Sequence, residues 1–118
     1  MAQGARTERI NEEFREVLAQ EIQRLKDPRV GFVTVTGVKV TSDLRHARIF
    51  YTVLGDESER RASGAGLRSA RAHLRAVLGR QVRLKFLPEL EFEEDTALEE
   101  AIRIDRIIDR VRGSEEET

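Results

Sequence analysis

Apolar residues recur every three or four positions along the first part of the chain. The members of this stripe are Ile10, Phe14, Val17, Leu18, Ile22 and Leu25. Such spacing is typical of an amphipathic helix, here of about five turns. Thr7 has the side chain of an N-cap residue, so we expect residues 1–6 to be a frayed end. Pro28 ends the helix, because its ring disfavours helical backbone at Asp27.

The next two segments alternate between apolar and polar residues, a pattern typical of strands. Residues 30–40 read VGFVTVTGVKV, in which Gly37 shifts the phase of the alternation and so indicates a bulge. Residues 47–54 alternate again after a turn at 41–44. Two strands joined by so short a turn predict an antiparallel hairpin.

The second half of the chain predicts helices around one further strand. Residues 56–79 are expected to be mostly helical, with an interruption at 63–66 and with Gly79 just past the helix end. The alternating stretch QVRLKFL at 81–87 predicts a third strand, ended by Pro88. After an extended acidic segment, Asp95 or Thr96 would cap a last helix. Its apolar positions are Leu98, Ile102, Ile108 and Val111.

This order of elements predicts an α+β fold, with helices packed on one face of a three-stranded sheet. The other face is left to solvent or to a partner. A chain of 118 residues suits one domain, which we place at residues 1–112. Residues 113–118 are polar and acidic and are expected to be a disordered tail. We expect a monomer.

Composition removes several classes of function. There is no cysteine, and the two histidines, His46 and His73, are far apart in the sequence. The chain has no GxSxG, Walker or HExxH motif, so we expect no catalytic residue, no cofactor and no metal site. It also has neither an apolar signal core nor an apolar run long enough to span a membrane. These observations favour a cytoplasmic protein.

One enzymatic alternative rests on a cluster of carboxylates. Its members are Glu89, Glu91, Glu93, Glu94 and Asp95. Carboxylate oxygens are ligands that Mg²⁺ prefers, so the alternative is a Mg²⁺-dependent enzyme that uses these side chains. We favour instead a solvated acidic rim and rank the enzyme far below.

The net charge of −1 conceals a strong asymmetry along the chain. Residues 1–90 hold 17 basic and 11 acidic residues, whereas residues 91–118 hold 4 and 11. Within residues 60–85 there are eight cations and no acid. A region of one sign and this size is typical of a surface that binds an anionic partner.

We interpret these cations as an RNA-binding surface. Arg68, Arg71 and Arg75 follow each other at steps of three and four, which places them on one helix face. Arg80, Arg83 and Lys85 would extend that stripe onto the third strand, and Arg45 and Arg48 would join it from the hairpin. Small residues at 63–66 and 69–72 would let a phosphate backbone approach. A merely solvated arginine face is the alternative, but such surfaces usually mix signs, and the absence of acids favours binding.

Four stretches, in order, carry a resemblance to a known family. They are RTERINEEFREVLAQEIQ at 6–23, DPRVGFVTVTGVKVTSDLRHARIFYTVLGD at 27–56, LRSARAHLRAVLG at 67–79 and VRLKFLPELEFEEDTALEEAIRIDRII at 82–108. The sharpest matches are Asp27-Pro28-Arg29, Ser42-Asp43-Leu44, Ala47 and Pro88-Glu89-Leu90. Over roughly residues 6–111, the chain resembles ribosome-binding factor A, a bacterial factor for assembly of the small ribosomal subunit.

The resemblance implies a type II KH-like fold of order α-β-β-α-α-β, with a C-terminal helix or extension. KH domains usually grip nucleic acid with a GxxG loop, which this sequence lacks. In the family an Ala-x-Gly kink between two helices replaces that loop. The matching residues here are Ala70, Arg71 and Ala72, so alanine stands where the family has glycine.

The resemblance also implies a function. The chain would bind 16S rRNA within the free, immature 30S subunit and assist late maturation, including 5′-end processing, without cutting RNA, and it would be linked to growth in the cold. Its acidic segment at 89–100 would face away from the rRNA or mimic phosphate toward ribosomal proteins. The alternatives are a general KH-like RNA-binding module without ribosome specificity, and a protein-interaction domain that uses the exposed sheet face.

Overall fold

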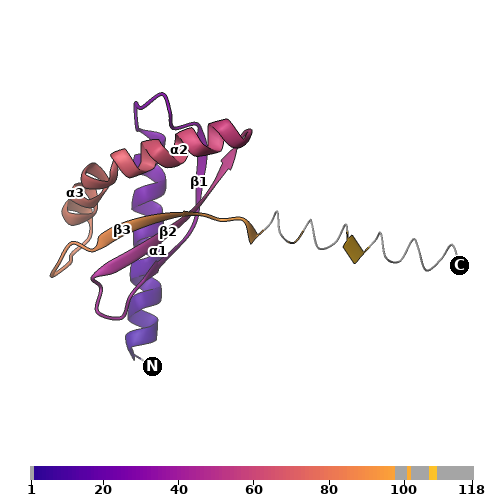
Figure 1. Cartoon of the computed structure of the whole chain (residues 1–118). Coiled ribbons are helices and arrows are strands. Elements are labelled where there is room, and N and C mark those ends of the chain that lie inside the picture. Colours follow the sequence, from indigo (N-terminus) through magenta and orange to yellow (C-terminus); the bar gives the residue numbers. More distant parts are fainter. Residues whose placement is uncertain (1, 98–100, 102–106, 109–118) are drawn as a thin grey trace, which may run out of the picture.

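A computed structural model describes residues 2–97, 101, 107 and 108. The elements follow in the order α1 (Ala2–Gln23), β1 (Phe32–Val40), β2 (His46–Leu54), α2 (Glu57–Ser69), α3 (Arg71–Gln81) and β3 (Glu89–Glu94). The predicted α+β class and the order α-β-β-α-α-β are therefore confirmed. In Figure 1, α1 lies behind the strands, and α2 and α3 lie beside β3. No helix in these ranges is long and apolar enough to cross a membrane.

The three strands form one sheet in the order β1-β2-β3. β1 and β2 pair antiparallel, so the predicted hairpin is confirmed. The register shifts between Val35 and Gly37, which confirms the bulge expected there. β2 and β3 run parallel, and their pairing begins with His46 opposite Glu89.

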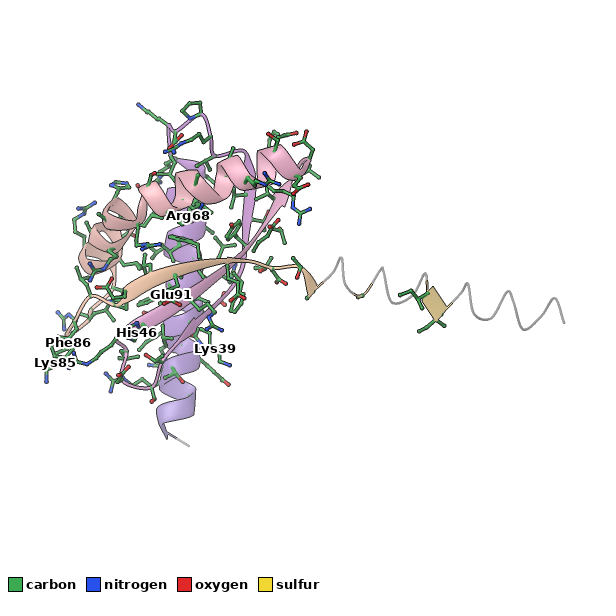
Figure 2. All side chains as sticks on the ribbon, viewed as in Figure 1. Lys39, His46, Arg68, Lys85, Phe86 and Glu91 are labelled. Atoms are coloured by element: carbon green, nitrogen blue, oxygen red, sulfur yellow. The ribbon has the colours of Figure 1, made fainter. Side chains whose placement is uncertain are left out.

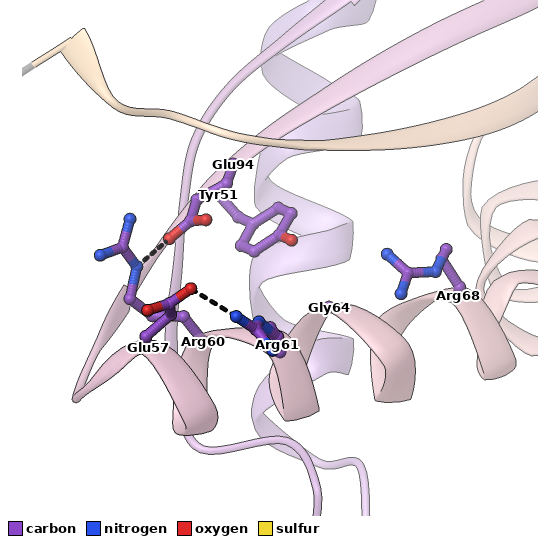
Figure 3. Close-up of a pocket in the computed structure, with 7 residues that line it drawn as sticks. All are labelled: Tyr51, Glu57, Arg60, Arg61, Gly64, Arg68 and Glu94. Carbon is purple, nitrogen blue, oxygen red and sulfur yellow. Dashed lines mark hydrogen bonds and ion pairs between the residues drawn. The ribbon is translucent and has the colours of Figure 1, made fainter.

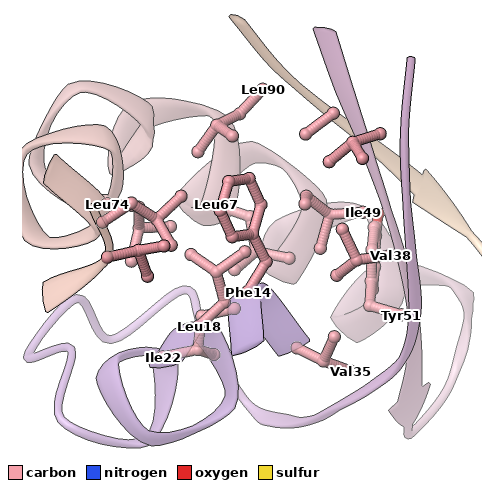
Figure 4. Packing of buried hydrophobic residues seen from close by; sticks show 14 of the residues in the cluster. Phe14, Leu18, Ile22, Val35, Val38, Ile49, Tyr51, Leu67, Leu74 and Leu90 are labelled. Atoms are coloured by element: carbon pink, nitrogen blue, oxygen red, sulfur yellow. The ribbon is translucent and has the colours of Figure 1, made fainter. Parts of the chain in front are cut away.

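The core lies between α1 and the inner face of the sheet (Figure 4). The predicted stripe supplies Ile10, Phe14, Leu18 and Ile22, all buried. Along β1 and β2, successive side chains point alternately into this core and to the outer face, as the pleat of a strand requires. The core also takes Leu67 from α2, Leu74 and Leu78 from α3, and Leu90 from β3. Burying this apolar surface is what holds the helices on one side of the sheet.

The prediction of a frayed N-terminus at 1–6 was wrong. α1 begins at Ala2, and Thr7 lies inside it rather than capping it. The Thr7 hydroxyl donates a hydrogen bond to the Gly4 carbonyl at 2.9 Å, as helical threonines do toward the preceding turn. Residues 2–6 include alanine, glutamine and arginine, which favour helix, so nothing in this segment stops the helix at Thr7.

The third strand was predicted in the wrong place. Residues 81–87 do not form a strand: α3 runs through Gly79 to Gln81, and a loop follows it to Pro88. β3 is instead the acidic segment Glu89–Glu94, whose ladder starts with the Glu89 N–H donating to the Arg45 carbonyl at 2.8 Å. Val82 is buried without belonging to a ladder, so apolar alternation alone could not tell this loop from a strand.

The interruption expected at 63–66 is also absent. α2 begins with a capping box formed by Asp56 and Glu59 and continues through all four residues. Three of them, Ser63, Gly64 and Gly66, are buried against the body. A Cβ on Gly66 would lie 2.5 Å from Val30 Cγ2, so the small residue at this position permits close packing and does not break the helix.

The helix pair is broken further on, at Ala70. Its backbone has φ −85° and ψ 0°, and α3 starts at the next residue. The predicted last helix falls largely outside the described residues, as do Leu98, Ile102, Val111 and the tail at 113–118. Asp95 Oδ1 accepts a hydrogen bond from the Ala97 N–H at 3.0 Å, as an N-cap residue does.

Ser63 should matter for stability. Its buried hydroxyl accepts from the Gly31 N–H at 3.0 Å and donates to the Arg29 carbonyl at 3.3 Å, and so ties α2 to the segment before β1. We expect Ser63→Ala to lower the free energy of unfolding by about 1–2 kcal/mol. Chemical denaturation measures this, with exposed Ser69→Ala on the same helix as the control. Equal stability of the two variants would contradict the assignment.

Arg75 should hold the loop before β3. Its Nε donates to the Pro88 carbonyl at 2.8 Å and its Nη2 to the Leu87 carbonyl at 3.1 Å. We expect Arg75→Gln to cost about 1–3 kcal/mol, since hydrogen bonds from a charged donor are lost, and to speed amide exchange around Glu89. The exposed Arg80→Gln, on the same helix, is the control. Slow exchange retained in Arg75→Gln would show that the loop is held by other contacts.

Candidate nucleic-acid interface

The predicted arginine stripe does not form one helix face. Arg68 lies in the last turn of α2, whereas Arg71 is the first residue of α3, and the break at Ala70 separates them. The guanidinium of Arg75 is engaged with the loop carbonyls and lies 3.4 Å from a Glu89 carboxylate oxygen. The shared face predicted for Arg68, Arg71 and Arg75 was therefore wrong, because helical spacing was extended across the break in the helix.

Among the described residues, no side chain caps the start of α3, and one side-chain donor next to the junction has no partner. Ala70 has no side-chain oxygen, so the first N–H groups of α3 have no side-chain cap. Arg71, directly after the junction, has a buried Nε that makes no hydrogen bond within the part of the chain that the structure describes. Ala70, Arg71 and Ala72, the predicted kink residues, thus coincide with a helix N-terminus that favours negative charge.

Three of the predicted residues do come together at another place. Arg83 and Lys85, from the loop after α3, line a small cavity with Phe86 and with Arg6 of α1. Arg45, from the turn between β1 and β2, places its guanidinium carbon 4.9 Å from the centre of the Phe86 ring. Lys85 Nζ lies 5.6 Å from the same ring. We call Arg6, Arg45, Arg83, Lys85 and Phe86 the basic tip.

The basic tip is open to solvent. Phe86 is 47% exposed, and Figure 2 shows it beside Lys85 at the end of the loop between α3 and β3. The cavity there has a volume of about 140 Å³ and also contains Asp43. The Thr41 hydroxyl and the Arg45 N–H donate hydrogen bonds to that carboxylate, and they lower the pKa of Asp43. The Asp43 carboxylate is thus hydrogen-bonded to groups of its own turn.

Sequence reasoning missed Arg6 and Phe86. Arg6 was assigned to a frayed end, and Phe86 to a strand. Neither residue can be assigned to the basic tip until the turn at 41–44 and the loop at 82–88 are known to be neighbours. The pairing of β2 with β3 makes them neighbours, and no local pattern indicates it.

The remaining predicted residues lie apart from the tip. Arg48 is on the outer face of β2, opposite Lys39 of β1, and its Nε is 3.5 Å from a Glu93 carboxylate oxygen. That face also carries His46 and Glu91, so it mixes signs (Figure 2). Arg80 is exposed in the last turn of α3.

Two glutamates of the acidic segment form ion pairs with arginines of other elements. Glu94 forms an ion pair with Arg60 of α2, and Glu93 one with Arg48. Asp95 accepts hydrogen bonds from Ala97 N–H and from the Thr36 hydroxyl, and both lower its pKa. Over the described part of the chain, no three His, Asp or Glu side chains are grouped so as to hold a metal ion.

A recess missed by sequence reasoning lies between α2 and the ends of β2 and β3 (Figure 3). It has a volume of about 570 Å³. Arg60, Arg61 and Arg68 line it together with Tyr51. Of these cations only Arg68 was among the expected binding residues.

Comparison with known proteins identifies the family of the chain. The model of the family described as ribosome-binding factor A matches residues 6–108. Ribosome-binding factor A of Geobacter sulfurreducens is 44% identical, over 94% of this chain and 98% of that protein. The Streptomyces coelicolor protein of the same name is 47% identical over 98% of this chain and 74% of its own length.

Solved structures agree with this assignment. The crystal structure of ribosome-binding factor A from Thermus thermophilus aligns with a TM-score of 0.70 and 31% identity, covering 77% of this chain and 97% of that one. Coordinates of the Thermus thermophilus factor fitted as a homology model into a cryo-EM map of a 30S complex align with a TM-score of 0.62 and 32% identity. They cover 73% of this chain and 91% of that one. With its sequence, its element order and its sheet all in agreement, the chain belongs to the ribosome-binding factor A family.

Proposed function

We propose that this protein is a ribosome assembly factor that binds the immature 30S subunit in the cytoplasm, as a monomer, through its 16S rRNA. It assists late maturation of that rRNA, including processing of the 5′ end, while nucleases make the cuts. Membership of the family supports this, as does the Thermus thermophilus relative placed in a 30S complex. The observation that carries the proposal is the basic tip.

The chemistry of the tip suits folded RNA. Four cations from three separate segments lie at the tip, and two of them, Arg45 and Lys85, lie against its half-exposed aromatic ring. Lys and Arg side chains that neutralise phosphates release counterions, which supplies affinity without reading sequence. An exposed ring next to cations can also stack on an unpaired base. The tip can therefore bind an rRNA region that combines backbone with an exposed base.

The helix junction offers a second contact. The uncapped start of α3 presents backbone N–H groups, and Arg68 and Arg71 flank it in the sequence. Helix N-termini of this kind favour phosphate oxygens. A phosphate there and others at the tip would hold a stretch of rRNA in its immature arrangement until maturation displaces the factor.

Loss of tip charge should weaken binding to the small subunit. We expect Arg83→Gln combined with Lys85→Gln to reduce affinity for purified 30S subunits on the order of tens of fold near 0.1 M salt, and to flatten the slope of log K against log salt by about two contacts. Co-sedimentation over a salt series measures both quantities.

A matched control is available at the other end of α1. Arg24→Gln with Lys26→Gln also removes one arginine and one lysine and should leave 30S affinity nearly unchanged. Equal loss in both variants would show a general effect of net charge and contradict a role for the tip. Wild-type protein that binds unrelated structured RNA as tightly as 30S subunits would instead indicate a general RNA-binding module.

A further inference from the structure

The recess between α2 and the sheet has the size and charge of a site for one nucleotide. Its volume of about 570 Å³ falls in the range of small-ligand pockets. The lining residues are Tyr51, Glu57, Arg60, Arg61, Gly64, Arg68 and Glu94. Three cations against two acids leave a net positive charge. Figure 3 shows α2 on one side of the recess and the ends of the strands on the other.

Two of the three arginines are held by the two acids. Arg60 Nε lies 2.5 Å from a Glu94 carboxylate oxygen, and Arg61 Nη2 lies 2.5 Å from a Glu57 carboxylate oxygen. Arg68 is exposed, and within the described residues it forms no ion pair with an acid. Its charge is therefore the one available to an incoming anion.

Tyr51 supplies an unused donor at the floor of the recess. The residue is only 5% exposed, yet it lines the cavity, and among the described residues its hydroxyl has no hydrogen-bond partner. The hydroxyl faces the open recess rather than the packed core, so it can donate a hydrogen bond to a ligand that enters there. Burial and the nearby Glu94 charge raise the pKa of Tyr51, so the hydroxyl keeps its proton at neutral pH.

Gly64 keeps the tyrosine and the free arginine facing the same space. A Cβ at this position of α2 would lie 3.0 Å from the Tyr51 hydroxyl oxygen and 3.4 Å from Arg68 Nη1. Both groups are thus within a few ångströms of one point in the recess. Glycine is unfavourable within a helix, and here its lack of a side chain leaves that point open.

We propose that this recess binds the phosphate group of a nucleotide, with Arg68 and the Tyr51 hydroxyl donating to phosphate oxygens and the paired Arg60 and Arg61 forming a positive rim. A guanidinium and a neutral hydroxyl are both good donors to phosphate. The phosphate belongs to an RNA strand or to a free nucleotide, since both present the same group. The proposal extends the proposed rRNA binding to a site outside the basic tip.

Tyr51→Phe removes one hydroxyl and keeps the ring. We expect it to weaken binding of an end-labelled single-stranded oligoribonucleotide, measured by anisotropy, by roughly tenfold, as for one hydrogen bond to a charged group. Arg68→Gln should weaken it at least as much. The thermal midpoint of Tyr51→Phe should not fall, since the hydroxyl has no partner in the described structure. Arg24→Gln is the matched control for loss of one arginine.

The single tyrosine separates the two sources of phosphate. The chain has one tyrosine and no tryptophan, so tyrosine emission reports on the recess alone. Pyrophosphate does not absorb in this range and can be titrated directly. A change in emission with pyrophosphate, together with displacement of the oligoribonucleotide by guanosine monophosphate, assigns the site to free nucleotides. Displacement by unlabelled RNA and not by guanosine monophosphate assigns the site to a strand, provided that Arg68→Gln weakens binding of the same RNA. Unlabelled RNA that displaces the oligoribonucleotide equally well from the wild type and from Arg68→Gln counts against the recess.

The proposals for the recess and for the tip can be refuted independently of each other. If Tyr51→Phe and Arg68→Gln bind the oligoribonucleotide as the wild type does, and pyrophosphate changes the tyrosine emission of Arg68→Gln as it changes that of the wild type, the recess proposal is overturned, whatever the tip variant does on 30S subunits. If these variants lose oligoribonucleotide binding while Arg83→Gln with Lys85→Gln binds 30S subunits normally, the recess stands and the role of the tip is contradicted.

Discussion

The parallel pairing of β3 with β2 brings together charged groups that are far apart in the sequence. Its first hydrogen bond joins the Glu89 N–H to the Arg45 carbonyl, and this places the loop after α3 beside the turn of the hairpin. Arg45, Phe86 and Lys85 meet for that reason. The same ladder carries Glu93 and Glu94 to the strand positions from which they reach Arg48 and Arg60. One pairing thus brings the cations of the tip together and also positions the acids of two ion pairs, Arg48–Glu93 and Arg60–Glu94.

The arginines consequently serve different purposes, although the sequence presents them as one run. Arg75 ties a loop to a helix through two carbonyl groups, and so contributes to the fold. Arg60 is held by an acid from another element. Arg68 and the cations of the tip remain exposed, where they can release counterions from RNA. Counting cations along the chain could not separate these uses, because each depends on a partner distant in sequence.

The small residues of α2 have two roles: some pack the helix against the body, and one lines the recess. Gly66 permits the segment around Val30 to pack against the helix, and Ser63 bridges to the same segment. Gly64, two residues earlier than Gly66, instead faces Tyr51 and Arg68. A short run of small residues therefore attaches the helix to the body and also keeps the recess open. From the sequence alone, the same run indicated an interruption of the helix and a place where a phosphate backbone could approach.

The pattern of apolar and polar residues within one segment was sufficient to predict α1, the hairpin and its bulge. The stripe from Ile10 to Ile22, the alternation in the hairpin and the phase shift at Gly37 each follow from the repeat of a helix or a strand, and each is observed. The sequence by itself also determined the class of fold, and its run of cations is the basis of the proposed anionic partner. The position of β3, the break at Ala70 and the grouping of Arg6 with Arg45 and Phe86 were decided by tertiary structure alone. These three features depend on contacts between backbone groups and side chains that are far apart in the sequence. The periodicity of residues within one segment carries no information about such contacts.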